Sequence, residues 1–493
     1  MKKKIVIISI LALIKLTIQL IGNRNYGFHR DELLHLSASE HLEWGFMEFP
    51  PFIGFIGRLS DWLFGYSLMG TRMFPTLAGV AILVLTCLVA KELKGNKYAV
   101  LLAGICVLSF LPFYRNHTLF QPVAFDQLFW TLGFYYLIRF LNTENHEYLI
   151  LTGLILGIGL MNKYTILIWA FGVFIGMIFY YKGRIFKNKW WYISGLLSVL
   201  IILPNIIWQF QNNLPLLRHL QELSESQLSE LHPLEFGIAQ LNYPFTFFVS
   251  IVGVVYLIGD KRFRSIGIAS IIIFFTMWFL HAKAYYVFAL YPVLFGAGSV
   301  KVSSWLEDKN SVLRYAIAAV ILLPSLPYIP HLTPVLSIQK YVAYSDLEED
   351  NGRIILEGDY ADMFGWEEQV RIVDSLYRSL TPEEKNTCVI WAENYGEAGA
   401  LKIIGNKYGL PDPISRHGSF WKWGYGNENA TVWISIGNET PSVEYIFEQT
   451  ELVSMIYHKY AIGEENGIPL YICRKPKLKI KQWWADYEPY IFN

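Results

Sequence analysis

Charged residues are scarce in this chain of 493 residues. They make up 17% of the sequence, whereas a soluble domain carries about 25%. Hydrophobic residues reach 53% and gather in apolar runs long enough to cross a bilayer. The composition therefore indicates a polytopic membrane protein. The formal net charge is zero, so no basic surface favours a nucleic-acid partner.

The sequence is also poor in cysteine. Its four cysteines show no disulfide or metal-ligand spacing. We expect Cys87 and Cys106, in apolar runs, and Cys388 and Cys473, in expected strands, to be buried thiols. The chain has neither a Gly-rich phosphate loop nor an Asp-x-Asp motif, so it gives no sign of a nucleotide-sugar site.

Eleven apolar runs are expected to span the membrane. The first, Ile5–Ile21, follows the positive segment Met1–Lys4. A cleavable signal peptide is the alternative. No small-x-small cleavage site precedes Asn23 and Lys15 interrupts the apolar core, so we favour a retained span. The other runs are 74–91, 98–113, 122–141, 148–160, 163–181, 190–208, 241–258, 264–281, 284–299 and 312–329.

The loops between these runs differ in charge. With a cytoplasmic N-terminus, four of the five cytoplasmic loops are rich in Lys and Arg, as the positive-inside rule requires; they are 91–97, 182–189, 261–264 and 301–314, and the fifth is 139–147. The outer loops are then 22–73, 114–122, 161–164, 209–240 and 281–286. We therefore predict a multi-pass protein of the cell (inner) membrane with its C-terminus outside.

Two domains follow from this topology. Residues 1–335 form the expected transmembrane domain, with a first outer loop at 22–73. Residues 336–493 are more polar and alternate expected strands with helices, which is typical of a small α/β domain. The expected strands are NTCVIWAENY, ATVWISIG and PLYICRKP, and the expected helices are GEAGALKIIGNKYG, ending at Gly409, and Ser442–Gln449.

The first outer loop contains the segment FHRDELLHLSASEHLEWGFMEFPP, residues 28–51. It predicts a helix over Asp31–Trp44, closed by Gly45, and a second helix over Phe52–Phe64 after two prolines. Both helices could lie in the interface plane. Asp31 and Glu32 are interpreted either as helix N-terminal charges or as carboxylates for general-base chemistry.

Polar clusters from distant parts of the sequence fall on the same expected outer side. Ionisable residues at span ends are costly unless they pair or bind something. A single lysine there is commonly a snorkelling anchor, but several clusters beside a carboxylate pair favour a binding site. The clusters contain Asp31 and Glu32, Arg115 and His117, Lys163 and Tyr164, and His281, Lys283, Tyr285 and Tyr286.

Motifs along most of the chain carry a resemblance to a known family. They are HRDELLHLSASEHLEWGFMEFPPF, GRLSDWLFGYSLMGTRMFPTLAG, RNHTLFQPVAFDQLFW, GLILGIGLMNKYT, LPNIIWQFQNNLP, HAKAYYVFALYP, FGWEEQV, ENYGEAGALKIIGNKYGLP and SRHGSFWKWG. Together they resemble bacterial glycosyltransferase family 39, which is protein-mannosyltransferase-like and includes the related aminoarabinose transferases of lipid A. The acidic pair followed by two prolines is the most specific of them.

The resemblance implies a GT-C fold of about eleven transmembrane helices with an outer active site. Such enzymes move a sugar from a polyprenyl-phosphate carrier to a lipid, glycan or protein acceptor. Asp31 matches the family's first-loop acidic residue and is the expected base, with Glu32 as second choice. The aminoarabinose branch has Glu-Lys-Pro where this chain has Glu48, Phe49 and Pro50, so one phosphate contact must come from another residue.

The chemistry of this reaction assigns further roles. A departing lipid monophosphate needs cations and hydroxyl donors; the candidates are Arg115, Lys163, Lys283, Tyr164, Tyr285 and Tyr286. A base on the opposite face of the sugar implies inversion. His417, Trp421 and Trp423 are candidate acceptor or sugar contacts, with a domain core or a membrane-facing belt as the alternative. The segment Gly396–Gly399 either binds an anion or permits tight packing.

No cofactor is required by this scheme, and a divalent metal is left open. Glu48 with His29, His35 or His117 is the candidate metal set, although interfacial histidines are more often plain hydrogen-bonding groups. Two other classes of function share the spans and cationic clusters. One is a transporter or flippase of lipid-linked sugars, for which we find no inverted repeat. The other is a membrane scaffold whose α/β domain binds a partner.

Overall fold

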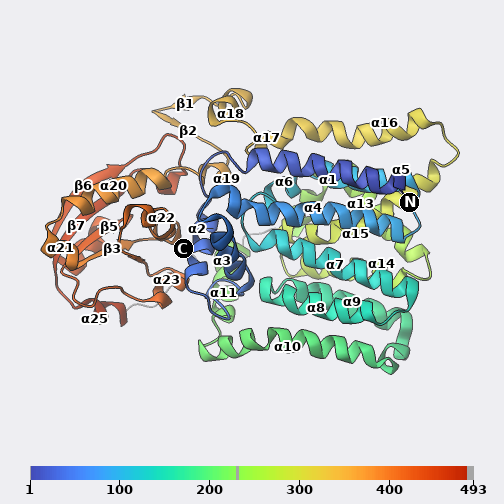
Figure 1. The fold of residues 1–493 in the computed structure, drawn as a ribbon, viewed down its shortest axis with the longest axis horizontal. Coiled ribbons are helices and arrows are strands. Elements are labelled where there is room, and N and C mark those ends of the chain that lie inside the picture. The colour runs from blue at the N-terminus through green and yellow to red at the C-terminus, as the bar shows by residue number, and fades with distance from the viewer. Residues whose placement is uncertain (1, 229–232, 486–493) are drawn as a thin grey trace.

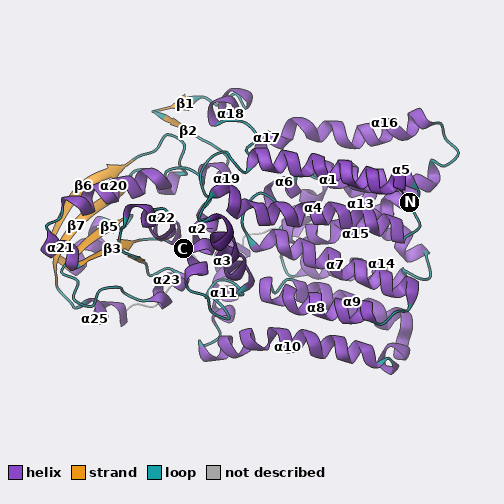
Figure 2. Cartoon of the chain, viewed as in Figure 1, coloured by secondary structure: helices purple, strands orange, loops and turns teal. Residues whose placement is uncertain are grey.

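A bundle of long, roughly parallel helices forms the larger part of the molecule, and a sheet lies beyond one end of it (Figures 1 and 2). The computed structural model describes residues 2–228 and 233–485. Residue 1, residues 486–493 and residues 229–232 of the expected outer loop 209–240 lie outside the described residues. The chain from 336 to 485 is called the C-terminal region below.

Each of the eleven expected apolar runs falls on a bundle helix. These helices are α1 (Lys2–Gly22), α4 (Leu68–Glu92), α5 (Lys97–Ser109), α7 (Pro122–Thr143), α8 (Glu147–Asn162), α9 (Ile166–Tyr181), α10 (Lys189–Gln211), α13 (Pro244–Gly259), α14 (Arg264–Phe279), α15 (Tyr291–Trp305) and α16 (Ser311–Leu322). The expected multi-span helical fold is therefore confirmed.

Six helical segments of the described chain are long and apolar enough to cross a membrane by themselves: Lys2–Gly22, Leu68–Glu92, Ile166–Ile185, Lys189–Gln211, Ala284–Trp305 and Ser311–Leu332. α5, α8 and α14 are apolar but shorter, and the α12–α13 pair is bent by 106°. The outward face of α10 exposes Leu196, Val199, Leu203 and Phe210, as a lipid-facing helix does. The protein is thus a multi-pass membrane protein whose span count depends on the short and bent helices.

Short helices cover the bundle end that faces the sheet. α2 (Arg30–Glu40) and α3 (Phe52–Phe64) belong to the first loop, and they lie between the bundle and the sheet (Figure 1). α3 matches its expected range, whereas α2 ends before the expected Trp44. The other connecting helices are α6 (Pro112–Asn116), α11 (Pro215–Leu223), α12 (Pro233–Leu241), α17 (Ile329–Leu332) and the 3-10 turn η3 (Ala284–Leu290).

The C-terminal region is built on a mixed five-stranded sheet. Its strand order is β4 (Pro413–Ile414), β3 (Cys388–Ala392), β5 (Val432–Ile436), β7 (Ile468–Pro476) and β6 (Phe447–Ile456). β3 is parallel to β4 and β5, while β7 is antiparallel to β5 and β6. Its helices are α18 (Ile338–Tyr344), α19 (Gly358–Ala361), α20 (Trp366–Ser379), α21 (Pro382–Asn386), α22 (Tyr395–Ile403), α23 (Gly418–Trp423), α24 (Thr440–Ile446) and α25 (Ile480–Ala485), and a two-stranded hairpin joins β1 (Glu349–Asp350) to β2 (Arg353–Ile354).

Alternate residues of β3 enter two different cores, because successive side chains of a strand point to opposite faces. Ile390 belongs to a core that continues through Leu33 of α2 into the bundle. Val389 and Trp391 belong to a separate core with Trp433 and further tryptophans of α25. The C-terminal region is therefore packed onto the bundle through α2.

Two sequence predictions for this region need correction, and one strand was missed. The helix expected to end at Gly409 ends at Ile403 and is followed by a 3-10 turn, η5 (Gly405–Tyr408). The short helix expected to reach Gln449 ends at Ile446, and the next residues begin β6. β6 was not expected at all. The buried-thiol prediction is confirmed, since all four cysteines are free and buried.

Candidate active site

The carboxylates of the first loop lie in the first turn of α2. His29 is the N-cap residue, and its Nδ1 accepts a hydrogen bond of 3.1 Å from the backbone N–H of Asp31. The backbone N–H of His29 donates in return to Glu32 Oε2 at 2.9 Å. This reciprocal capping box fixes where α2 begins, so Asp31 and Glu32 point from a rigid helix start.

Asp31 is half-buried and held at both oxygens. Gln121 Nε2 donates to Oδ2 at 2.8 Å, and the Tyr395 hydroxyl donates to Oδ1 at 2.9 Å. Burial alone would raise the pKa of Asp31, but the charge of His29, the hydrogen bond from Tyr395 and the charge of Arg115 outweigh it and lower the pKa below its ordinary value. Asp31 is therefore an oriented carboxylate that stays ionised.

Glu32 has a different environment from its neighbour. Its side chain and that of Arg72 are both fully buried, and Arg72 Nη2 lies 2.7 Å from Glu32 Oε2. Glu32 Oε1 also accepts from the backbone N–H of Phe120 at 2.9 Å. With every oxygen engaged, Glu32 ties the starts of α2 and α4 together and has no lone pair exposed to a substrate.

Arg115 is linked to Asp31 through a glutamine. Arg115 Nη1 donates to Gln121 Oε1 at 3.1 Å, and the amide nitrogen of the same Gln121 donates to Asp31. The other face of the guanidinium makes a bidentate pair with Asp359 of α19, with distances of 2.7 and 2.8 Å. All three guanidinium nitrogens are thus engaged, two of them by a carboxylate of the C-terminal region.

Lys163 has a different set of neighbours at the same end of the bundle. Its ammonium lies 4.1 Å from the ring centroid of Tyr286 and 5.6 Å from that of Tyr285, which are cation–π contacts. In the described part of the chain Lys163 forms no ion pair within 4 Å. It interacts electrostatically with Asp126 in the first turn of α7. Its charge is therefore less neutralised than that of Arg115, which pairs with Asp359.

The tyrosine pair joins this lysine to Asp31. The rings of Tyr285 and Tyr286 meet edge to face with centroids 4.6 Å apart. Tyr285 also interacts electrostatically with Arg115 and Asp31, while Tyr286 interacts with Lys163 and Lys283. Electrostatic interactions thus link residues from α2, α6, the α8–α9 connection and η3, which together are called the polar cluster below.

Tyr164 lies at the edge of this cluster. Its hydroxyl donates to Asn205 Oδ1 at 2.7 Å and accepts from Gln209 Nε2 at 3.2 Å. Both partners belong to α10. The hydroxyl is therefore already engaged in joining the α8–α9 connection to α10.

The aromatic candidates of the C-terminal region are spread over three sites. His417 packs edge to face on Tyr395 with centroids 4.7 Å apart. Trp423 stacks on His41 of the first loop at 4.3 Å. Trp421 packs against the second core of the sheet. Of the three, only His417 adjoins a residue that contacts Asp31, and Trp421 corresponds to the domain-core alternative.

Glu48 joins the first loop to α23. Its carboxylate accepts from the Ser419 backbone N–H at 2.7 Å and from the Ser419 hydroxyl at 2.5 Å. Burial raises its pKa above the ordinary value despite these hydrogen bonds. Gly418 is required here, because a Cβ on it would lie 1.8 Å from Glu48 Oε1. Glu48 thus fastens α23 to the first loop.

The candidate metal set is not brought together. His29 Nε2 lies 3.6 Å from carboxylates of Asp359 and Asp362, and buried His117 Nε2 lies 2.9 Å from Gln127 Oε1. Glu48 contacts Ser419 instead of either histidine. Among residues 2–228 and 233–485, no group of three His, Cys, Asp or Glu side chains is arranged to hold a metal ion.

Four contacts of the cluster were missed by sequence reasoning. Gln121 and Tyr395 lie 90 and 364 residues away from Asp31 in the chain. Arg72 lies 40 residues away from Glu32, and Asp359 lies 244 residues away from Arg115. Gln121 and Tyr395 fall inside the quoted motifs QPVAFD and ENYGEAG. A motif shows that a residue is present, but only the fold shows which distant carboxylate it contacts.

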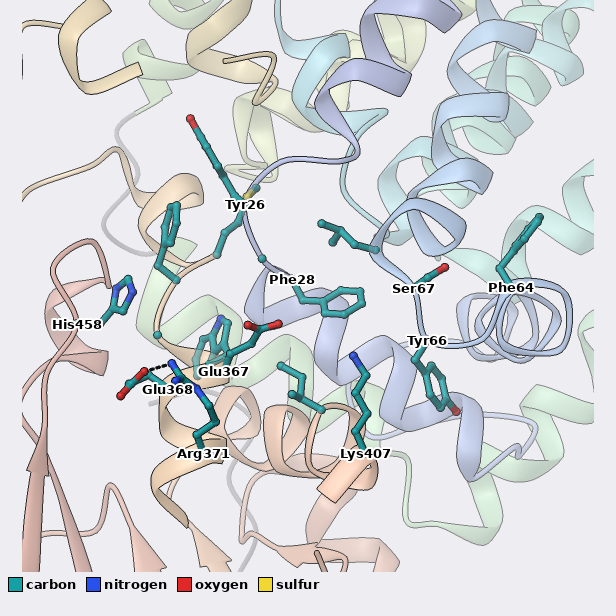
Figure 3. Close-up of a pocket in the computed structure, with 17 residues that line it drawn as sticks. Tyr26, Phe28, Phe64, Tyr66, Ser67, Glu367, Glu368, Arg371, Lys407 and His458 are labelled. Atoms are coloured by element: carbon teal, nitrogen blue, oxygen red, sulfur yellow. Dashed lines mark hydrogen bonds and ion pairs between the residues drawn. The ribbon is translucent and has the colours of Figure 1, made fainter. Parts of the chain in front are cut away.

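A cavity of about 640 Å³ opens beside the first loop (Figure 3). Its walls come from the first loop, the turn between α3 and α4, and α20, and they include Phe28, Tyr66 and Trp366. Neither Asp31 nor Lys163 is among its lining residues in the described chain. The polar cluster around Asp31 is therefore separate from this cavity, although both lie where the first loop meets the C-terminal region.

The protein thus has a multi-span bundle with a polar cluster at one end, next to a C-terminal region built on a mixed sheet, and comparisons with known proteins show that this arrangement is a GT-C fold. Residues 48–208, about a third of the chain, match the family model described as dolichyl-phosphate-mannose-protein mannosyltransferase. The predicted resemblance to the protein-mannosyltransferase-like and aminoarabinose-transferase-like glycosyltransferases is confirmed. A search of curated protein sequences found no match.

Three solved structures, of two proteins, share the fold. The chain is similar to ArnT from Cupriavidus metallidurans, both in the apo state and bound to undecaprenyl phosphate, with 10% identity, a TM-score of 0.61, and coverage of 95% of this chain and 97% of that chain. It is also similar to the apo oligosaccharyltransferase of Archaeoglobus fulgidus, with 12% identity, a TM-score of 0.51, and coverage of 88% and 69%. The expected GT-C fold is thus confirmed.

Proposed function

We propose that this protein is a membrane glycosyltransferase that moves a sugar from a polyprenyl-phosphate donor to an acceptor hydroxyl. The observation that carries the proposal is the position of Asp31. This ionised carboxylate is held at 2.8 and 2.9 Å by Gln121 and Tyr395, and a cationic, tyrosine-lined cluster lies beside it at the end of an apolar bundle. The match to the mannosyltransferase family model supports the same reaction class.

Lys163 is the main proposed ligand of the donor phosphate. Its ammonium is half-buried over the ring of Tyr286 at 4.1 Å, where a point charge acts in reduced dielectric. Lys283 interacts with the same tyrosine and is proposed to share this role, with Tyr285 and Tyr286 contributing hydroxyls, whereas the Tyr164 hydroxyl already donates to Asn205. The structural similarity to ArnT bound to undecaprenyl phosphate supports a polyprenyl-linked donor.

Arg115 and Glu32 receive different roles from those first expected. Arg115 would have to leave Asp359 or Gln121 before it could bind a phosphate, so we propose that it orients Gln121 and through it Asp31. Glu32 is fully buried against Arg72, and we propose that it fixes the start of α2. His417 is proposed to support Tyr395 rather than to bind the acceptor directly.

The proposed reaction is a single displacement. The acceptor hydroxyl gives its proton to Asp31 while its oxygen bonds to the anomeric carbon. The bond between that carbon and the phosphate oxygen breaks, and the lipid monophosphate leaves with the electron pair. Attack opposite the leaving group inverts the anomeric centre. A positioned base contributes about 10²- to 10⁴-fold to such a step. The bonds and the proton of this displacement are accounted for without a metal ion. Measuring sugar transfer in the presence of EDTA tests whether a metal ion assists.

We also propose an arrangement in the membrane. The Lys- and Arg-rich loops favour a cytoplasmic N-terminus, which puts the polar cluster and the domain 336–493 on the outer side of the cytoplasmic membrane and leaves residues 1–335 as the transmembrane domain. Asp31 would then act on acceptors that have already crossed the membrane. Reactivity of cysteines introduced at exposed Lys97 and exposed Glu367 towards an impermeant thiol reagent tests this, with only the second expected to react in intact cells.

Turnover by the purified protein tests the function. A panel of radiolabelled polyprenyl-phosphate sugars is offered with lipid, glycan and peptide acceptors, and label transfer is measured by extraction and chromatography. We expect transfer from at least one donor, with inverted configuration in the product. Movement of lipid-linked sugar across proteoliposomes without transfer would overturn the proposal in favour of a flippase.

A further inference from the structure

α22 lies unusually close to α2. A Cβ on Gly399 would be 2.8 Å from the Cβ of Leu33, and a Cβ on Gly396 would be 2.7 Å from the ring of Trp366 and 3.3 Å from the Cβ of Arg30. Such distances leave no room for a side chain at either position. The glycines of the segment Gly396–Gly399 therefore permit tight packing. This packing brings the start of α22 against the start of α2.

The start of α22 is itself rigid. Asn394 caps the helix by accepting from the backbone N–H groups of Gly396 and Glu397 at 2.8 and 3.0 Å. Glu397 closes the capping box by accepting from the backbone N–H of Asn394. Tyr395 is the first residue of this capped helix, and its ring packs on His417. The direction of the Tyr395 side chain is thus fixed from two sides.

The hydroxyl of Tyr395 donates a hydrogen bond to Asp31 and keeps its proton. It lies 2.9 Å from Asp31 Oδ1. Burial and the charge of Asp31 raise the pKa of Tyr395 well above its ordinary value, so the hydroxyl keeps its proton. A hydrogen bond to an ionised carboxylate stabilises the charged form and fixes its orientation.

We propose that Tyr395 is a positioning residue for Asp31, supplied by the C-terminal region. Tyr395 holds Oδ1 while Gln121 holds Oδ2, which fixes the carboxylate plane and leaves one further lone pair on each oxygen for the acceptor hydroxyl. This inference rests on the proposed role of Asp31 as the base. It makes the C-terminal region part of the active site rather than only a cover over it.

Ion pairs hold the C-terminal region in the position that this requires. Arg30 pairs with Asp362 at 2.5 Å, and Lys422 pairs with Glu43. Each joins a residue of the first loop to one of the C-terminal region. The Tyr395–Asp31 contact therefore sits among charged contacts that fix the two parts relative to each other.

Tyr395→Phe tests the proposal because it removes one oxygen and keeps the ring. We expect kcat to fall by about 10- to 100-fold with little change in the KM for the donor. The acid limb of the pH–rate profile should move upward by about one pH unit, because the ionised form of Asp31 loses a donor. Tyr408→Phe, on the exposed 3-10 turn η5, is the matched control and should behave as wild type.

A second readout does not depend on turnover. Infrared titration of the carboxyl groups, with Asp31→Asn to identify the Asp31 signal, should show the same upward shift in Tyr395→Phe. Gly399→Ala should also shift it by displacing α22, whereas Gly463→Ala, where a Cβ meets nothing within 4 Å, should not. An unchanged Asp31 titration in Tyr395→Phe would overturn the inference. If the Asp31 titration shifts in Tyr395→Phe but the wild-type protein transfers no sugar, the Tyr395–Asp31 contact would stand and the proposed function would be overturned.

Discussion

Glu32 and Arg72 form a fully buried ion pair, with Nη2 and Oε2 2.7 Å apart. The pair joins the first turn of α2 to the first turns of α4, and Glu32 also accepts from the backbone N–H groups of His29 and Phe120. Of the adjacent carboxylates Asp31 and Glu32, one is therefore available to a substrate and the other is enclosed.

Glu32→Gln should destabilise the protein. It leaves the Arg72 charge buried without a counter-charge, and breaking one partner of such a pair costs about 3–5 kcal/mol. We expect a clearly lower melting temperature in detergent, followed by tryptophan fluorescence. Glu451→Gln, exposed on β6, is the control. A melting temperature equal to that of wild type would show that the buried pair does not hold α2 in place.

Lys163→Met should weaken donor binding. The substitution keeps the length of the side chain over Tyr286 but removes the charge proposed to meet the phosphate. Since a hydrogen bond to a charged group contributes about 1.5–3 kcal/mol, the KM for the donor should rise by about 10- to 100-fold. Steady-state kinetics with varied donor measure this, and Lys97→Met, exposed at the other end of the bundle, is the control. An unchanged KM would remove Lys163 from the donor site.

Three glutamates near the start of α22 should make stability depend on pH. Burial, together with the charges of Glu465 and Glu393, raises the pKa of Glu397 well above its ordinary value, and burial raises the pKa of Glu465 and Glu393 as well. The folded state thus keeps protons that the unfolded state loses at about pH 4.3. Stability must therefore fall as pH rises through the folded-state pKa values.

The melting temperature should accordingly decrease over a pH range that begins above the ordinary glutamate pKa of about 4.3. Glu397→Gln keeps an oxygen to accept from the backbone N–H of Glu393, which is 2.9 Å away in wild type, and removes the charge. It should raise the melting temperature at the upper end of this range and flatten the slope. A slope unchanged from wild type would show that these glutamates titrate normally.

The sequence was most informative where local chemistry decides the structure. The apolar runs predicted the bundle helices because a bilayer demands long apolar segments, and Pro50 and Pro51 marked the start of α3. The strand β6 was not predicted because most of its residues are exposed at the sheet edge. Its sequence therefore shows no alternation of buried apolar residues. Its pairing with β7 is a tertiary effect.

The candidate site was predictable only in part for a similar reason. Asp31 and Lys163 could be proposed from motifs and span ends, but the partners of each carboxylate could not. Asp31 and Glu32 are adjacent in the sequence, which does not show that Glu32 is buried against Arg72. Likewise, Arg115 looks like a free cation until the fold places Asp359 against it.

Transfer by Asp31→Asn is the measurement that tests the account most directly. The asparagine keeps the shape of the side chain but cannot take the acceptor proton. Initial rates are compared with wild type and with Asp308→Asn, an exposed residue of the loop after α15, using whichever donor wild type accepts. We predict a loss of at least about 100-fold for Asp31→Asn, with donor binding kept and the control unaffected. Transfer by Asp31→Asn at the wild-type rate would contradict it.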